Sequence, residues 1–206
     1  MSDSDHTMTE ADLARVWDER HRDAEAVQTP SLVLRAWPHL LPTAGDALDL
    51  ACGLGVDALW LAARGLRVAA WDRSAVAIER LEASARERGL RIDAEARDLT
   101  TAPPPPERFD LILVAHFLDR ALCPRIAAAL RPGGRLFYQT YTRETSSGRG
   151  PRNPAFRLAP NELIQLFPDL ILRAYRAEGH LAEPDSPLAD LALMVAERPS
   201  GAPVSG

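Results

Sequence analysis

The chain has 206 residues, of which 46% are hydrophobic, and this suits one domain with a single sizeable core. Its net charge of −5 argues against nucleic acid as the main partner, because binding phosphates requires a clustered positive face. No apolar run approaches the roughly 18 residues of a membrane span, and the acidic, polar start differs from a signal peptide. We therefore expect a cytoplasmic protein, monomeric or homodimeric, with no membrane partner.

The two cysteines, Cys52 and Cys123, lack the spacing of a metal site or of a disulfide scaffold, so we expect no metal. The patterns along the chain predict a helical N-terminal cap over 1–45, the main domain over 46–197 and a flexible tail over 198–206. Val16 and Trp17 lie on the apolar stripe of a helix expected near the start of the cap.

The first motif of the main domain is a short apolar strand that runs into a pair of glycines, Gly53 and Gly55. A helix and a second strand follow, and that strand ends on Asp72, 23 residues after Asp49. One strand–helix–strand unit of this length brings a tight glycine turn and a ribose-binding carboxylate to the same edge of a parallel sheet. The motif therefore predicts a cofactor that contains a nucleoside.

The details of the turn distinguish between nucleoside cofactors. A dinucleotide fingerprint requires Gly-x-Gly-x-x-Gly, so that the backbone can approach a pyrophosphate at a helix N-terminus. In this chain the three glycine positions of the fingerprint are occupied by Ala51, Gly53 and Val56. The second glycine of the motif, Gly55, falls on a variable position of the fingerprint. The missing glycines argue against NAD or FAD.

Alternating strand and helix patterns continue to residue 197 and predict a doubly wound α/β sheet, with ligands at the carboxyl ends of its strands. Further strands are expected at 91–98, 109–116, 135–138, 170–178 and 188–197. The first of these ends on Asp98, and the strand at 135–138 follows a Pro-Gly-Gly turn. Helices are expected at 117–130 and at 160–167, and the second of them opens on Pro160.

The segment Leu48-Asp-Leu-Ala-Cys-Gly-Leu-Gly55 resembles motif I of the class I S-adenosylmethionine (SAM) methyltransferases, and further motifs of that family follow in order over 46–140. The resemblance implies a three-layer, doubly wound fold with a seven-stranded, mostly parallel sheet and one antiparallel strand. The segment Trp17-Asp-Glu-Arg-His21 is similar to a Trp-Asp-x-Arg-Tyr segment of small bacterial methyltransferases of the tellurite-resistance and thiopurine type.

The resemblance also implies the cofactor, SAM, the product, S-adenosylhomocysteine, and a set of cofactor contacts. In that family the front helix covers the cofactor, the glycine turn holds its amino-acid end, and acids after the second and third strands contact its ribose and adenine. The corresponding residues here are Trp17, Arg20, Asp49, Ala51, Cys52, Gly53, Gly55, Asp72, Arg73, Asp98, Leu99 and Ala115.

The acceptor site is expected beyond the fourth and fifth strands. His116 is the best candidate for a general base, and the alternative is that it only packs beneath the cofactor or bonds a loop carbonyl. Strand alternation places Tyr138 and Tyr141 on opposite faces, and Tyr141 lies nearer to the site. A thiol, selenol or oxyanion acceptor would require no general base.

The connection 142–157 is long and carries four arginines in an otherwise acidic chain. Such loops are often lids, and we expect Arg143 and Arg152 to bind an anionic small-molecule acceptor, together with His116 and Tyr141. A solvated loop is the alternative. At the level of function, a regulator that binds SAM without turnover stays open, as does an aminopropyltransferase of the same fold, which would require an acidic pocket.

Overall fold

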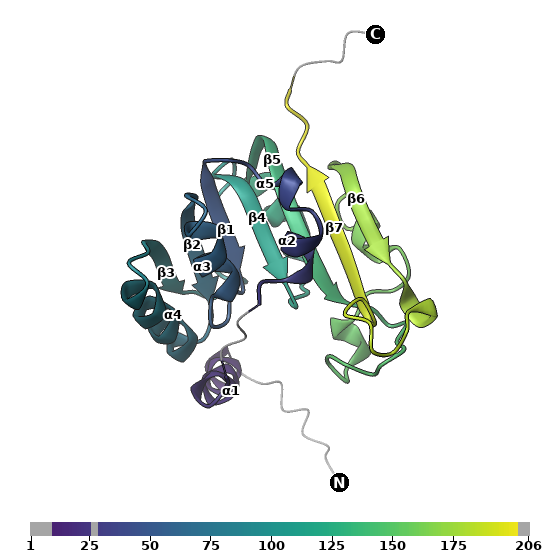
Figure 1. The fold of residues 1–206 in the computed structure, drawn as a ribbon, viewed down its shortest axis with the longest axis horizontal. Helices are drawn as coiled ribbons and strands as arrows, with labels where there is room; N and C mark the ends of the chain where they lie inside the picture. Colours follow the sequence, from purple (N-terminus) through teal and green to yellow (C-terminus); the bar gives the residue numbers. More distant parts are fainter. Residues whose placement is uncertain (1–9, 26–28, 202–206) are drawn as a thin grey trace.

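The computed structural model describes residues 10–25 and 29–201, and its centre is a sheet of seven strands in the order β3-β2-β1-β4-β5-β7-β6 (Figure 1). The strands are β1 (Asp46–Leu50), β2 (Arg67–Asp72), β3 (Ile92–Ala96), β4 (Phe109–Ala115), β5 (Leu130–Tyr141), β6 (Ile171–Ala177) and β7 (Leu191–Glu197). β1 to β5 pair in parallel, and β7 runs antiparallel to both β5 and β6. This confirms the expected class I methyltransferase fold with one antiparallel strand.

Helices cover both faces of the sheet and make the three layers. They are α1 (Glu10–Arg22), α2 (Leu32–Ala36), α3 (Val56–Ala62), α4 (Ala75–Glu87), α5 (Cys123–Ala129) and α6 (Glu162–Gln165), with short 3-10 turns at Pro38–Leu40, Pro154–Phe156 and Gly179–Leu181. The longest helices have 13 residues, and no helix in the described ranges is long and apolar enough to cross a membrane.

The core has two halves, one on each face of the sheet, because successive side chains of a strand point to opposite faces. Leu48 and Ile112 pack with α5 and α6, whereas Leu111 and Leu113 pack with α2, α3 and α4. All four side chains are fully buried. Central parallel strands covered on both faces read as continuous apolar runs, which is why they were recognisable in the sequence.

The two helices on the face of the sheet that carries Leu48 and Ile112, α5 and α6, are shorter than predicted. The helix expected at 117–130 begins only at Cys123, because the Asp119 carboxylate accepts hydrogen bonds from the amides of Ala121 and Leu122 and holds a turn there. The helix expected at 160–167 spans Glu162–Gln165, and it starts after Asn161, whose φ of +61° is not helical.

Two strand boundaries also differ from the expectation. The third strand ends at Ala96, so that Asp98 lies in the loop after it. The predicted Pro-Gly-Gly turn lies inside β5, which begins at Leu130, and the pairing of β4 with β5 shifts register opposite this segment. The division into cap, domain and tail stays a prediction, and parts of the cap and of the tail lie outside the described residues.

A cluster of charges joins the amino ends of four strands at the sheet edge opposite the carboxyl ends. The Asp46 carboxylate accepts from Arg67 Nε at 2.7 Å, from Arg131 Nη2 at 2.8 Å and from Arg108 Nη1 at 3.0 Å. Arg131 also donates to Asp110 at 2.7 Å. The hydrogen bond from Arg67, helped by that from Arg131, lowers the pKa of Asp46 from 3.8 to about 2 against the opposing effect of burial.

We expect Asp46→Asn to lower the free energy of unfolding at pH 7 by about 1–2 kcal/mol, less than the full shift because two of the three arginines are largely exposed. Since the pKa is lower in the folded state, the contribution is present above about pH 4 and is lost as the pH falls toward 2. Urea unfolding between pH 2.5 and 7 should show a shallower acid limb for Asp46→Asn. Asp93→Asn, at an exposed position, is the control. An acid limb for Asp46→Asn that is as steep as the limb of wild type or of this control would contradict the expectation.

Candidate functional site

The glycine turn after β1 is tied to the end of β2 by the Asp72 carboxylate. One oxygen accepts from the amide of Gly53 at 2.8 Å and the other from the amide of Ser74 at 2.9 Å. Ser74 in turn caps α4, its Oγ accepting from the amide of Ala77 at 3.1 Å. Ala51 enters the turn with φ +57°, a conformation that favours glycine. The predicted meeting of the turn with the acid of β2 is therefore present in the structure.

The two glycines of the turn serve different purposes. A Cβ at Gly55 would lie 2.3 Å from a methyl group of Leu81, so packing between α3 and α4 excludes any side chain there. A Cβ at Gly53 would meet only His21 Nε2, at 3.5 Å. Beyond the residues adjacent to Gly53 in the chain, no other described atom lies within 4 Å of that position. The space over Gly53 offers a cradle that a side chain would fill.

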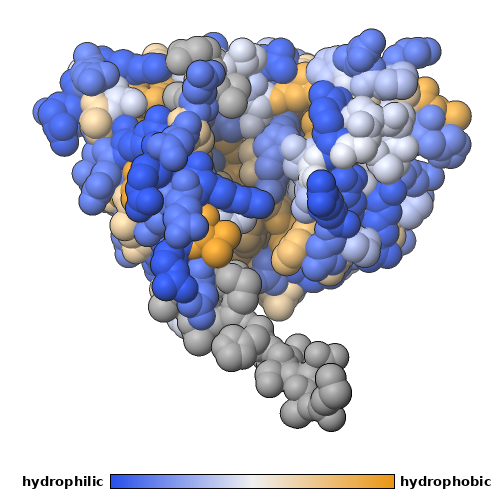
Figure 2. All heavy atoms as spheres, turned by 90° about the horizontal axis from the view of Figure 1, so that it is seen from below, coloured by the Kyte–Doolittle hydropathy of each residue, from blue (hydrophilic) through white to orange (hydrophobic). Residues whose placement is uncertain are grey.

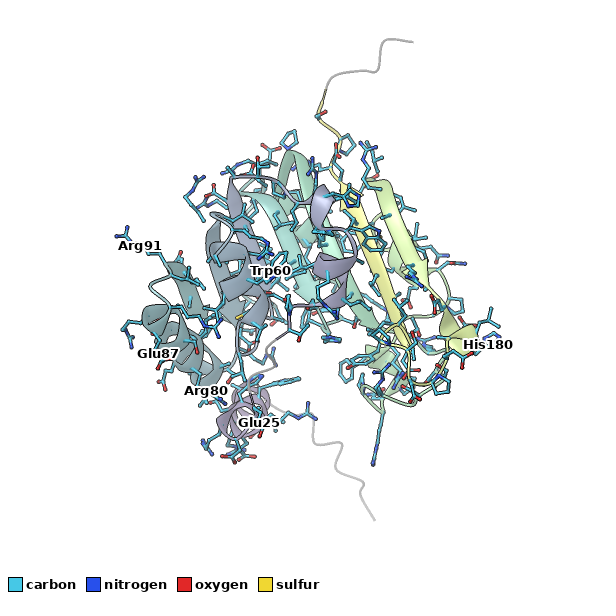
Figure 3. All side chains as sticks on the ribbon, in the orientation of Figure 1. Glu25, Trp60, Arg80, Glu87, Arg91 and His180 are labelled. Carbon is cyan, nitrogen blue, oxygen red and sulfur yellow. The ribbon has the colours of Figure 1, made fainter. Side chains whose placement is uncertain are left out.

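Helix α1 packs on α4, beyond the carboxyl ends of the strands (Figure 1), and its His21 lies beside the turn. Asp18 accepts from Ser74 Oγ at 2.6 Å, and Arg80 of α4 donates to the carbonyl of His21 (Figure 3). His21 Nδ1 is buried and has no hydrogen-bond partner in the described part of the chain. The other ring nitrogen, Nε2, is the atom that lies beside Gly53.

Trp17 and Arg20, which we expected over the cofactor, are more exposed than His21. Trp17 is 38% exposed, and the Arg20 guanidinium lies 4.8 Å from its ring centre. The Trp17 ring stacks on the His21 ring with 5.7 Å between centroids. Sequence reasoning missed His21, although it occupies the Tyr position of the Trp-Asp-x-Arg-Tyr segment and that position was the available signal.

Buried carboxyl groups lie beneath the turn. Asp49 accepts from the amide of Ala58 at 3.0 Å, and burial, together with nearby Asp57 and Asp72, raises its pKa well above 3.8. Asp57 accepts from the amide of Ser31 at 2.7 Å and from its hydroxyl, and burial also raises its pKa. These contacts make Asp49 and Asp57 the links between β1, α3 and the segment before α2. Burial raises the pKa of the Cys52 thiol as well, so it is not a reactive thiolate.

The next strand ends carry the other predicted cofactor contacts. Asp98 accepts from the amide and hydroxyl of Thr100 at 2.9 and 2.8 Å, and these bonds outweigh its burial and lower its pKa. Arg73 Nη2 lies 3.5 Å from Asp98, and Leu99 is buried. Ala115 ends β4. All of these residues lie at the carboxyl edge, beside the turn.

His116 follows β4 with φ +59° and lies at the same edge. Its Nε2 is 2.9 Å from Nε2 of buried Gln139, and its ring centroid is 5.0 Å from that of Tyr141. Surrounding protein displaces water from the ring and lowers the pKa of His116. Tyr138 is fully buried and donates to the carbonyl of Phe117 at 2.9 Å, which leaves Tyr141 as the tyrosine at the site.

The loop 142–157 is held by its own polar contacts. Arg157 is buried and donates to the carbonyls of Thr142 at 2.8 Å and Pro151 at 2.7 Å. Asp190 accepts from the amides of Ser146 at 2.7 Å and Arg149 at 2.8 Å, and hydrogen bonds from Ser147 and its neighbours lower the pKa of Asp190 despite its burial. Arg149 Nη2 donates to the carbonyl of Ser186 at 2.6 Å. Two of the four arginines are thus structural.

The other two arginines line a hollow of about 380 Å³ within this loop. Its lining is Arg143, Thr145, Gly148, Gly150, Pro151, Arg152, Pro154 and Arg157. Arg143 is exposed, and its Nε donates to the carbonyl of Pro154 at 3.3 Å. Arg152 is exposed and makes no hydrogen bond or ion pair within the described ranges.

The hollow is connected to the strand ends through Tyr141. Gly150 lies on the Tyr141 ring so closely that a Cβ would be 2.4 Å from Cδ1, and Arg157 lies 5.7 Å from the ring centre. Figure 2 looks at the molecule from below and shows a surface hollowed between two mostly hydrophilic flanks. His116, Tyr141 and the arginine hollow are therefore neighbours, and their role at an acceptor site stays a prediction.

Comparison with known proteins finds similarity over the part of the chain that contains this geometry. Residues 47–134 match the model of a methyltransferase domain. A ubiquinone biosynthesis O-methyltransferase of Methylobacterium sp. (strain 4-46) is 38% identical over 112 residues, which cover 52% of this chain and 45% of that protein. A counterpart from Coxiella burnetii is 31% identical over 101 residues. The chain thus spans less than half the length of the curated relatives that it matches.

Solved structures agree on the fold. TehB from Haemophilus influenzae superposes with a TM-score of 0.64 at 22% identity, over 81% of this chain and 61% of that one. The glycine turn with its acids at successive strand ends, the strand order and the matched domain agree with one another. The strand order is that of the class I methyltransferase fold, and residues 47–134 match a methyltransferase domain.

Proposed function

We propose that the protein transfers a methyl group from SAM to a small-molecule acceptor that carries an anionic group. The observation that carries this proposal is the position of the arginine hollow. It lies beside Tyr141 and His116, at the edge where the glycine turn offers a cradle over Gly53. A cofactor cradle and a cationic acceptor pocket on one sheet edge are what such a transfer requires.

The residues at the turn fit the cofactor of the family. The space over Gly53 admits an amino-acid tail, and His21 Nε2 lies beside the same region. Each oxygen of Asp72 accepts one backbone hydrogen bond and retains a lone pair for a ribose hydroxyl. When bound, SAM supplies a methyl group that its sulfonium has already activated.

The protein's part in the reaction is to position the acceptor. An in-line displacement requires the acceptor atom to be held about 3–3.5 Å from the methyl carbon, and this positioning supplies a large share of the rate. Arg143 and Arg152 would hold the anionic end of the acceptor, while Tyr141 and His116 line the path toward the strand ends. The names of the curated relatives favour an oxygen acceptor, and thiols and chalcogen oxyanions are the alternatives.

The charge of the hollow also bears on the competing functions. An aminopropyltransferase binds a cationic polyamine, which three lining arginines would repel.

A screen of aromatic carboxylates, phenols, thiols, selenite and tellurite, following S-adenosylhomocysteine release, tests the proposal. Tight SAM binding without turnover on any of them would favour the regulator.

Substitution of Gly53 tests the cradle. Gly53→Ala should weaken SAM binding at least tenfold in calorimetry, because its Cβ enters the space for the ligand. Gly89→Ala is the control, since Gly89 also has positive φ, +66°, but faces open space away from the turn. Both variants should lose similar stability, and only Gly53→Ala should lose affinity. A folded Gly53→Ala protein with the affinity of wild type would refute the cradle.

Substitution of Arg152 tests the acceptor pocket. Arg152→Ala should raise the acceptor KM roughly five- to tenfold and leave the SAM Kd unchanged, because the guanidinium meets acceptor and not cofactor. Added salt should reduce the difference, since the loop is exposed. Arg91→Ala is the control, because Arg91 is exposed at the opposite side of the molecule (Figure 3). Equal KM values for the two variants would support a merely solvated loop.

A further inference from the structure

Gln139 is a polar side chain in the interior of the sheet that uses both ends of its amide. It is 2% exposed, on β5 between Ala115 of β4 and Leu193 of β7. Its Oε1 accepts from the backbone amide of Val33 at 2.8 Å, and its Nε2 lies 2.9 Å from His116 Nε2. Gln139 therefore joins the first turn of α2 to the histidine at the proposed acceptor site.

The roles of the atoms in this chain follow from which of them can donate. A backbone N–H can only donate, so the atom of Gln139 that faces Val33 is the carbonyl oxygen. The amide nitrogen then faces His116 and can only donate, so His116 Nε2 accepts. A neutral imidazole has one N–H, and here it is on Nδ1.

We propose that Gln139 is a positioning residue that holds His116 as the neutral Nδ1–H tautomer, so that His116 offers the acceptor a hydrogen-bond donor and not a base. His116 is an exposed residue, and its Nδ1 has no hydrogen-bond partner within residues 10–25 and 29–201. The backbone bond from the His116 amide to the Gln139 carbonyl, 2.9 Å, holds the two residues in register. Strained φ at His116 fits a constrained functional residue.

The surroundings of the ring support the neutral form. Loss of water around the ring is the cause of the lowered pKa of His116, and no charged side chain contributes to it. The titratable group in contact with the ring is Tyr141 of β5, whose own pKa burial raises. Both groups therefore remain uncharged donors near neutral pH.

This tautomer restricts the acceptor and so deepens the proposed function, on which this step rests. The Nε2 lone pair is occupied by Gln139, and Nδ1 already carries its hydrogen, so the ring cannot remove a proton from a neutral hydroxyl. The acceptor must present a nucleophile that is already deprotonated, and Nδ1–H can orient a neighbouring oxygen of the same molecule. Acidic oxygen or sulfur acceptors fit this site, and aliphatic alcohols do not.

Nitrogen NMR of protein labelled in its histidines tests the tautomer without any acceptor. The His116 signals, identified by their absence in His116→Asn, should show a protonated Nδ1 and an unprotonated Nε2 at neutral pH. Gln139→Glu keeps the size and an oxygen for Val33, but its second oxygen accepts from the ring and should move the hydrogen to Nε2. A wild-type ring that carries its hydrogen on Nε2 would overturn the proposal, and that spectrum decides even if Gln139→Glu fails to fold.

Kinetics with an established acceptor test the role of the tautomer. Gln139→Glu should raise the acceptor KM about tenfold and leave SAM affinity unchanged, because the donor to the acceptor is lost. Gln165→Glu, the same change at an exposed site on α6, is the control and should leave the spectrum and both parameters as in wild type. A switched tautomer with unchanged KM would refute the donor role. Failure of all acceptors would count against the proposed function and leave the NMR result intact.

Discussion

The contact on which the site depends most is the bridge that the Asp72 carboxylate makes between two backbone amides. By accepting from Gly53 and Ser74, it fixes the glycine turn after β1 to the start of α4. A charged acceptor forms stronger hydrogen bonds than a neutral one, and here it is buried, where these bonds are strengthened further. The carboxylate therefore builds the cradle before it can contact any ligand. For this reason, removing it would disturb both the turn and ligand binding.

Helix α1 and the segment before α2 are attached to the same framework through acids. Asp18 reaches Ser74, and Asp57 holds Ser31, so two parts of the N-terminal region are anchored at the ends of α4 and α3. This attachment brings His21 over Gly53. The buried carboxyl groups are costly, and their raised pKa values show that cost. The hydrogen bonds that these carboxyl groups accept offset part of the free-energy cost of burying them.

In the loop 142–157, two arginines hold the backbone in place and the other two line the hollow. Arg149 and Arg157 donate to backbone carbonyls and, with Asp190, give the loop a defined shape. Arg143 and Arg152 then line a hollow within a fixed frame. A pre-organised loop loses less conformational entropy on binding than a flexible one. The net negative charge of the chain sets this local group of arginines apart from the rest of the surface.

The sequence by itself determined the succession of strands and helices, the two-faced core and the acids at or near the strand ends, because burial on a regular strand leaves a local pattern of apolar residues. Only the tertiary structure decided which polar atoms meet. The late start of α5 depends on hydrogen bonds from nearby amides to Asp119. The position of His21 depends on Gly53, which is distant in sequence. The contacts of Gln139 are likewise with residues distant in sequence, Val33 and His116. Hydrogen bonds between remote residues leave no periodic signal, since each requires one partner brought close by the whole fold.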